Sequence, residues 1–360
     1  MFNLSNLLTI KYKLYYYIQY KCESFAFRGM QMRKFKAIMC MVLIALLLGG
    51  AVFSVVYFSS DDENKKIVVT TFPIYDICRE ILGSEEDIMI LQDNGADMHS
   101  YQPTAKDITA ISKADLFVFI GGESDNWVGS IIRSSERVNL ERLSLMDYVN
   151  KLEESFDGII DGEHLHGHDH HDGEEHSDDC YDEHIWLSIK NMKRMTEIIL
   201  EKLIKVYPHM EQMLIKNAEE YIEKLDDLDT KYTEACANNS NTIVIADRFP
   251  FLYLAHDYNL KFLAAYHGCS SDTQASVSII SELIEKVNEE ELNNICVLET
   301  SDKSIANSVR FDSRCRSGVR VLTLDSCQAV SQSMLGETSY LSIMENNLNV
   351  LKKVINNEAN

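Results

Sequence analysis

Proline and glycine are scarce in this sequence of 360 residues, which holds four prolines and fifteen glycines. Their scarcity excludes collagen-like, proline-rich and Gly/Ser-linker architectures. The apolar share of 46% and the charged share of 25% are instead typical of a globular chain. The length is sufficient for two domains with cores of their own.

Basic residues are few outside the first 60 positions. Residues 1–60 hold seven Lys or Arg and one Glu, so the remaining 300 residues hold 27 basic against 55 acidic side chains. A body of that charge repels phosphate backbones, which argues against nucleic-acid binding. An acidic surface does suit cations.

Several familiar motifs are also missing. None of the nine cysteines forms a CxxC pair, so neither a zinc knuckle nor a thioredoxin-type site is indicated. Seven of them lie scattered beyond residue 60, which predicts buried thiols with at most one or two disulfides. The sequence contains neither an HExxH metallohydrolase motif nor the GxxxxGK[ST] loop of ATP hydrolases.

The longest uncharged run covers residues 37–58 and is 22 residues long. As a helix it could cross about 30 Å of hydrocarbon. Basic residues precede the run and acidic residues follow it, so it is predicted to anchor the acidic body on the extracellular face of the membrane. A cleaved signal peptide has the same order and is the alternative. Residues 1–36 form a basic segment, in which Met30 or Met32 would be a more conventional start.

From residue 65 onward, β-branched apolar runs alternate with helix-like stretches. Such alternation indicates βα units and therefore parallel sheets. Three runs fall within residues 61–185, the predicted first α/β lobe, and four fall within residues 237–360, the predicted second lobe. The predicted strands cover residues 67–71, 87–91, 116–122, 242–246, 260–266, 294–299 and 319–324.

Residues 186–236 are predicted to link the two lobes. From Ile189 to Cys236 the sequence has no glycine and one proline, and apolar residues recur every three or four positions. That spacing predicts one long amphipathic helix, kinked near Pro208. At about 1.5 Å per residue it would extend about 60–70 Å and join the lobes rigidly, with a ligand crevice between them.

Residues 161–184 contain seven of the eleven histidines, interleaved with Asp and Glu. Imidazoles at this density bind borderline metals such as zinc, nickel and copper. Without fixed geometry, such a loop is expected to hold several ions weakly. The alternative is a solvated acidic loop that binds metal only adventitiously.

A tight metal site needs ligands that the fold holds in place. In open α/β sheets, ligands bind beyond the carboxyl ends of the strands. The candidates after predicted strands are His99, Asp247 and Asp325, and His184 ends the His-rich loop. Two imidazoles from one lobe could then face two carboxylates from the other. Each residue also has an ordinary alternative, His99 as a loop histidine and each aspartate as a helix or turn cap.

Two further residues lie at the ends of predicted strands and are rivals for the third ligand position. His267 follows the strand predicted at 260–266, and Glu299 ends the strand predicted at 294–299. The spacing of residues alone leaves the choice between them and Asp247 open.

Four stretches, in their order and spacing, carry a family resemblance. They are MHSYQPTAKDI around His99, DEHIWLSIKN around His184, ADRFPFLYLAHDYNL around Asp247, and LTLDS at Asp325. With the His-rich loop, they resemble the solute-binding receptors of ABC importers for zinc and manganese, the cluster A-I group that includes streptococcal adhesin-type lipoproteins. The resemblance extends from about Lys65 to the end of the chain.

This resemblance implies two β/α lobes with parallel sheets joined by a long rigid helix, with one metal ion in the cleft between them. His99 and His184 match two family ligands, and Asp325 matches the carboxylate after the last strand. Family members carry His or Glu where this sequence has Asp247, which makes that aspartate the expected third ligand. Two histidines with two carboxylates resemble manganese-type sites, whereas a His-rich loop is typical of zinc receptors. Zn²⁺ is therefore the expected metal and Mn²⁺ the alternative.

The implied function is non-enzymatic. The protein would capture the metal outside the cell as a monomer and deliver it to a membrane permease that works with a cytoplasmic ATPase. Two other hypotheses rest on the residues themselves. One is a metal-dependent hydrolase that uses the same ligands with Glu299 as base. The other is a metal buffer or adhesin that uses the His-rich loop alone.

Overall fold

The structure is a computed structural model of the chain, which describes residues 12–13, 16, 66–92, 98–134, 140–155, 157–160, 181–237, 239, 241–268, 275–312 and 314–359. The predicted anchor at residues 37–58 and most of the His-rich loop, residues 161–180, lie outside the described residues. Among the helices that are described, none is both long and apolar enough to cross a membrane. Residues 62–360 form one compact unit that contains both sheets.

The first sheet has four parallel strands in the order β2-β1-β3-β4. Strands β1 (Ile67–Val69), β2 (Ile88–Ile90) and β3 (Leu116–Phe119) confirm the three predicted ones and are almost wholly buried. Strand β4 (Glu141–Ser144) was not predicted. Its sequence, ERLS, buries only one side chain at the edge of the sheet and so lacks the apolar run that marks the others.

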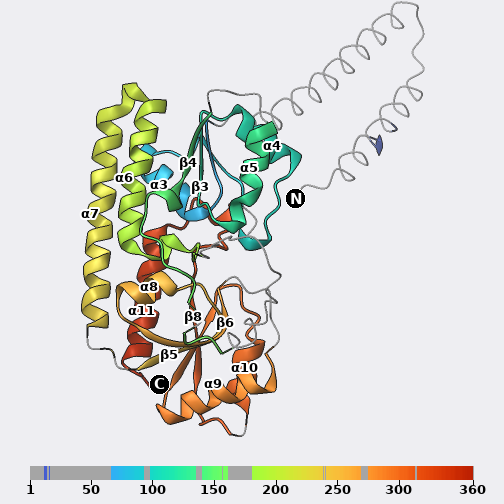
Figure 1. Cartoon of the computed structure of the whole chain (residues 1–360), viewed down its shortest axis with the longest axis vertical. Helices are drawn as coiled ribbons and strands as arrows, with labels where there is room; N and C mark the ends of the chain where they lie inside the picture. Colours follow the sequence, from blue (N-terminus) through green and yellow to red (C-terminus); the bar gives the residue numbers. More distant parts are fainter. Residues whose placement is uncertain are drawn as a thin grey trace, which may run out of the picture. The chain divides into compact units, whose positions relative to one another are not determined.

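The second sheet repeats this order as β6-β5-β7-β8, again with all strands parallel. Its strands are β5 (Thr242–Phe249), β6 (Lys261–His267), β7 (Asn294–Leu298) and β8 (Arg320–Leu324). All four were predicted, although β5 extends three residues beyond its predicted end. The prediction of an α/β fold with two parallel sheets is confirmed (Figure 1).

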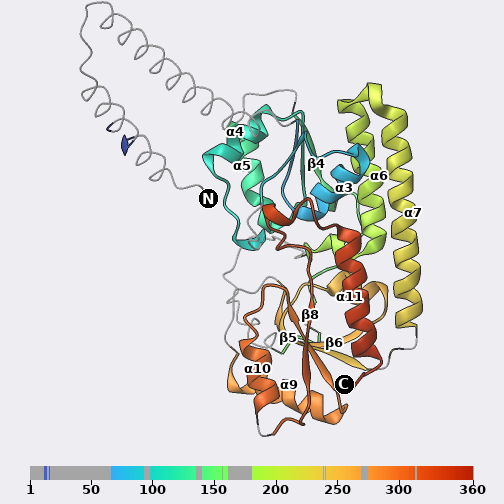
Figure 2. The same ribbon diagram turned by 180° about the vertical axis from the view of Figure 1, so that it is seen from behind.

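Helices cover both faces of each sheet (Figures 1 and 2). In the first lobe, α4 (Ala105–Lys113) and α5 (Asn126–Ser134) lie on one face, and α3 (Phe72–Leu82) lies on the other. In the second lobe, α9 (Val277–Glu289) and α10 (Ser304–Phe311) lie on one face, and α8 (Leu252–Asp257) and α11 (Tyr340–Ile355) lie on the other. One continuous apolar cluster joins α3, α8, α11 and both sheets.

The linking segment differs from its prediction. Instead of one helix of about 60–70 Å, it forms two helices, α6 (Ile189–Val206) and α7 (Glu211–Cys236), on either side of a short turn at Pro208–Met210. Proline lacks the amide proton of a helix interior and disfavours helical geometry in the residue before it. Tyr207 accordingly has φ −124° and ψ 59°. Pro208 does interrupt the helix, as its position predicted, but the chain reverses direction there instead of bending.

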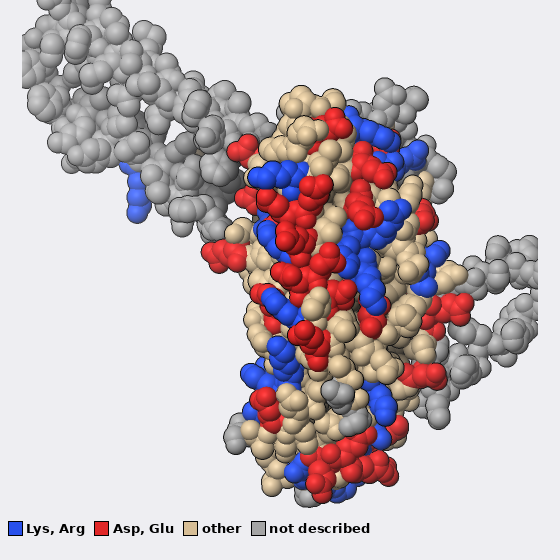
Figure 3. Space-filling view, turned by 90° about the vertical axis from the view of Figure 1, so that its left-hand side faces the viewer, with Lys and Arg blue, Asp and Glu red and all other residues tan. Residues whose placement is uncertain are grey.

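The two helices of this hairpin lie side by side (Figures 1 and 2). Lys193 of α6 forms ion pairs with Asp226 and Asp229 of α7, which identifies the helices as antiparallel. Lysine, arginine and acidic side chains alternate over the solvent face of this side of the molecule (Figure 3). Helix α7 packs against α3 of the first lobe and α11 of the second, and so it connects both lobes.

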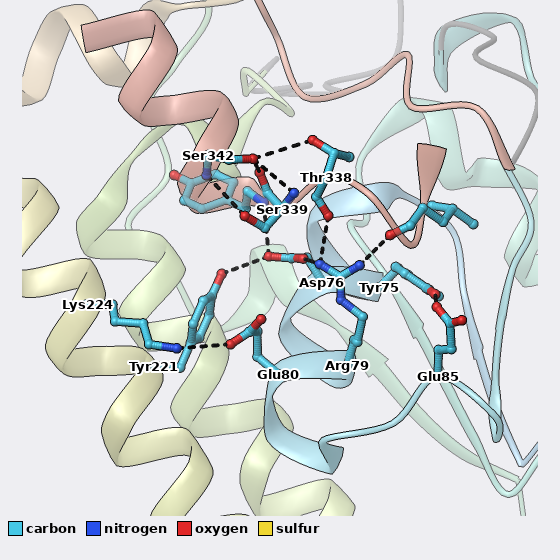
Figure 4. Close-up of polar contacts among 12 residues, drawn as sticks. Tyr75, Asp76, Arg79, Glu80, Glu85, Tyr221, Lys224, Thr338, Ser339 and Ser342 are labelled. Carbon is cyan, nitrogen blue, oxygen red and sulfur yellow. Dashed lines mark hydrogen bonds and ion pairs between the residues drawn. The ribbon is translucent and has the colours of Figure 1, made fainter. Parts of the chain in front are cut away.

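A buried carboxylate joins α3, α7 and α11 (Figure 4). Asp76 of α3 is fully buried, pairs with Arg79, and accepts hydrogen bonds from the backbone N–H of Tyr340 at 3.0 Å and from the Tyr221 hydroxyl at 3.2 Å. Arg79 also donates to the carbonyl groups of Leu335 and Thr338, which precede α11. A first-lobe carboxylate thus supplies negative charge at the N-terminus of a second-lobe helix, where the helix dipole favours it.

Replacing Arg79 with methionine is expected to destabilise the protein by about 3–5 kcal/mol at pH 7.5, because it leaves a buried carboxylate without its cation. Burial raises the pKa of Asp76 to about 6 in the folded chain, so this carboxyl is neutral in acid and ionised above that pH. The cost of Arg79→Met should therefore shrink as the pH falls from 7.5 to 5. Urea denaturation of wild type and Arg79→Met at pH 7.5 and at pH 5 measures this loss of unfolding free energy.

The matched control is Arg194→Met, which removes an exposed pair with Glu197 and should cost less than about 1 kcal/mol at either pH. An Arg79→Met penalty that is equal at pH 5 and pH 7.5 would contradict an ionisation-linked role for this junction.

Candidate metal centre

His184 is held from two sides. It is fully buried and comes directly before a short 3₁₀ turn, Ile185–Leu187. A single oxygen of Asp182, Oδ1, accepts the backbone N–H of His184 at 2.8 Å and lies 3.1 Å from its Nδ1. Trp186 donates its indole N–H to the carbonyl of Ser326 at 2.8 Å, which ties this segment to the residue after Asp325. Both the ring and the backbone of His184 are therefore fixed.

His99 lies on a 3₁₀ turn, Met98–Ser100, that follows β2. Its Nδ1 is 2.8 Å from the Ser124 hydroxyl, which comes from a turn after β3. Ser124 in turn donates its hydroxyl to Glu183 Oε2 and its backbone N–H to Oε1 at 3.0 Å. Burial raises the pKa of Glu183, and the hydrogen bonds from Ser124 act in the opposite direction.

The imidazole rings of His99 and His184 approach each other through their Nε2 atoms. The Nε2 atoms of His99 and His184 are 3.4 Å apart, and each Nδ1 faces an oxygen. Two nitrogens bound to one tetrahedral zinc ion at 2.0–2.1 Å are separated by about 3.3–3.4 Å. The observed separation therefore fits two nitrogens of a single tetrahedral centre.

Asp247 has a different environment from the one expected. It lies within β5 rather than after it, at a point where the register with β6 shifts. Its carboxylate accepts the backbone N–H of Arg248 at 2.9 Å and that of Leu298, at the end of β7, at 3.4 Å. These bonds fix the carboxylate beside the carboxyl end of β7.

Asp325 and Glu299 form a second group at the ends of β8 and β7. Glu299 accepts both the backbone N–H of Ser326, at 2.9 Å, and its hydroxyl, at 2.6 Å. Asp325 accepts the backbone N–H of Cys327, and Asn347 of α11 holds its backbone. Burial and then the neighbouring Asp325 raise the pKa of Glu299, and burial raises that of Asp325. Two carboxylates this close favour a cation or a shared proton.

The structure thus brings the predicted ligands together as pairs. His99 lies against His184, and Asp325 lies beside Glu299. Within the described part of the chain, no three His, Cys, Asp or Glu side chains are close enough together to hold one ion. The four-ligand set of His99, His184, Asp247 and Asp325 therefore stays a prediction.

The rival ligand His267 ends β6, in a segment that borders His184. A Cβ on the next residue, Gly268, would lie 3.0 Å from Cε1 of His184 and from the carbonyl oxygen of Phe249, so a side chain there would crowd the histidine. His267 also lines a small crevice with Asp182 and Glu154.

Sequence reasoning missed the oxygens behind the two histidines. Asp182 and Glu183 directly precede His184 in the run DEH, so their acidity was visible, but not which imidazole each would contact. Ser124 lies 25 residues from its partner His99 and carries no motif of its own. His99 and Ser124 come together because β2 and β3, the strands that precede them, flank β1 and end at the same edge of the sheet.

Comparison with known proteins places this arrangement in context. A family model described as zinc-uptake complex component A, periplasmic (ZnuA), matches residues 67–354. The chain is 29% identical over 295 residues to the zinc-binding lipoprotein AdcA of Streptococcus pneumoniae, covering 81% of this chain and 56% of that protein. It is 27% identical over 290 residues to the high-affinity zinc uptake system protein ZnuA of Bacillus subtilis, covering 79% and 86%.

The fold agrees with these matches. The crystal structure of the Zn(II)-bound ZnuA-like domain of Streptococcus pneumoniae AdcA superimposes with a TM-score of 0.63 and 27% identity, covering 80% of this chain and 98% of that one. Against full-length AdcA, the chain spans little more than half of the relative.

The hydrogen bond from Trp186 to Ser326 should stabilise the fold measurably. Trp186→Phe keeps a ring in the core but leaves the Ser326 carbonyl without its donor, which should cost about 1–3 kcal/mol. Trp127→Phe is the matched control, because the buried Trp127 Nε1 has no partner among the residues described. Trp127→Phe should lower the thermal unfolding midpoint less than Trp186→Phe does. Equal losses for the two variants would show that ring volume, not the hydrogen bond, matters.

Proposed function

The chain belongs to the zinc-uptake complex component A family, and on this basis we propose that it is a non-enzymatic receptor that captures Zn²⁺ and delivers it to an ABC permease. The zinc-binding relatives named above support zinc as the cargo. The observation in this chain that carries the proposal is the facing pair of imidazoles, 3.4 Å apart between Nε2 atoms.

Zinc is favoured over manganese by the donors at this pair. Imidazole nitrogens suit zinc, whereas manganese prefers oxygen donors in octahedral sites. Two carboxylates complete the proposed tetrahedral site, and Asp325 and Asp247 are their proposed sources. The close Asp325–Glu299 pair supports the first of these, because a divalent cation would relieve the repulsion between two buried carboxylates.

The proposed receptor works at the extracellular face of the membrane. Residues 37–58 would tether it there, or the body would be released after signal cleavage. As a monomer it would present its metal to a permease, whose ATPase lies on the cytoplasmic side. The acidic body would raise the local concentration of cations. The histidines of residues 161–184 would add weak sites for first capture.

Competitive zinc titration, with metal content read by mass spectrometry, tests the capture step. The chain lacking residues 162–178 should still bind one zinc ion tightly, because all four proposed ligands lie outside the deleted residues. His99→Ala and His184→Ala should each weaken this binding by at least about 100-fold, since each removes a direct ligand and not just an outer hydrogen bond. His209→Ala, on the exposed turn between α6 and α7, is the control and should bind zinc normally.

Asp325→Asn and Asp247→Asn in the same assay test the two proposed carboxylate ligands, and each substitution should weaken zinc binding. Loss of all tight binding on deletion of residues 162–178 would instead favour a metal buffer based on the loop. Tight manganese with weak zinc would keep the receptor and change its cargo.

The transport step has a cellular consequence. Cells without this protein should grow poorly when extracellular zinc is chelated, provided that no redundant importer is present, and added zinc should restore growth. The control is complementation with the His184→Ala variant, which should fail although the protein is made. Unchanged growth under chelation would contradict the transport role.

A further inference from the structure

We propose that Glu183, acting through Ser124, is a positioning residue that keeps the ring proton of His99 on Nδ1, so that Nε2 presents its lone pair to the metal. This inference rests on the proposed function, because it assigns His99 as a ligand through Nε2. It adds residues that do not themselves touch the ion. It also makes the availability of His99 depend on a carboxylate two hydrogen bonds away.

The direction of each hydrogen bond follows from the chemistry of its partners. Ser124 donates its backbone N–H to Oε1 of Glu183 and its hydroxyl to Oε2, so both carboxylate oxygens act as acceptors. The serine oxygen then has only acceptor capacity left for His99 Nδ1, 2.8 Å away. His99 must therefore carry its proton on Nδ1, and the lone pair of Nε2 points toward Nε2 of His184.

The fold gives Glu183 a narrowly limited space. Its side chain is buried, and a Cβ on Gly122 would lie 2.2 Å from Glu183 Oε1. Gly122 has a φ of +79°, a conformation that favours glycine. The turn after β3 thus passes directly against the carboxylate, and its next residues place Ser124 between Glu183 and His99.

His184 is positioned in a different way, which provides an internal comparison. One oxygen of Asp182 faces both the backbone N–H and Nδ1 of His184. In Asp182→Asn, the amide oxygen can take the place of that oxygen and accept both protons. Glu183 instead uses a different oxygen for each of the two Ser124 donors, Oε1 for the backbone N–H and Oε2 for the hydroxyl. In Glu183→Gln, either orientation of the amide sets its NH₂ group against one of those donors.

That conflict has a predictable result at His99. If the NH₂ group faces the Ser124 hydroxyl, the hydroxyl proton turns toward Nδ1, and the ring proton of His99 moves to Nε2. A protonated Nε2 cannot coordinate zinc. If the amide is reversed, the backbone N–H of Ser124 loses its acceptor and the turn is displaced. Glu183→Gln should therefore weaken zinc binding about 10- to 100-fold, the range expected for outer-shell partners of metal ligands, whereas Asp182→Asn should weaken it less.

The experiment is zinc competition at pH 7.5 on the full chain lacking residues 162–178, comparing wild type, Glu183→Gln, Asp182→Asn, Ser124→Ala and the double variant Ser124→Ala/Glu183→Gln. With the hydroxyl removed, no proton can be turned toward Nδ1, so the loss caused by Glu183→Gln should be smaller in the Ser124→Ala background. Such non-additivity distinguishes a relay from two independent structural effects. Thermal unfolding without metal reports whether each variant folds.

The tautomer provides a second readout that does not depend on affinity. Nitrogen-15 NMR of the histidine rings in the metal-free protein should show His99 protonated on Nδ1 in wild type and less so in Glu183→Gln. The His99 signal is assigned by its loss in His99→Ala. Equal zinc affinity for Glu183→Gln and wild type, or additive losses in the double variant, would overturn the inference while leaving the receptor intact. An absence of tight zinc binding in wild type would instead overturn the proposed function itself.

Discussion

An imidazole can offer a metal one nitrogen only while its proton is held on the other, and the described site is arranged around that constraint. Nδ1 of His184 faces an aspartate oxygen, and Nδ1 of His99 faces a serine hydroxyl backed by a glutamate. The supporting oxygens come from the turn after β3 and from the segment before α6. The parallel sheet brings these distant segments together, because its strand ends meet at one edge.

Much of the fold could be predicted because its strands are buried on both faces and appear as unbroken apolar runs. Strand β4 gave no such signal, since its polar sequence lies at an edge. Pro208 indicated a break in the linking segment, but a proline does not determine whether a helix bends or reverses. The contacts of Lys193 with Asp226 and Asp229 show the reversal, and these depend on tertiary structure.

The candidate site was only partly visible in the sequence. The residues of the histidine pair could be chosen because one follows a strand and the other ends a distinctive segment, and the structure places them within 3.4 Å. Asp247 was expected after the end of a strand, yet β5 continues past it with a shift in register. Such an irregularity leaves no mark in the pattern of apolar residues, so the sequence did not reveal it. Ser124 was missed for a different reason. Its role depends on its contacts with His99 and Glu183, which lie far from it in the sequence.

The junction around Asp76 has a consequence for how the chain folds. Because the first backbone N–H of α11, in the second lobe, donates to a carboxylate of the first lobe, and one apolar cluster continues through both sheets, each lobe completes its core only against the other. We therefore expect the two halves to unfold together rather than as two independent domains. Expression of the two lobes as separate chains would leave the Tyr340 N–H without its Asp76 acceptor and would expose the apolar side chains that the lobes share.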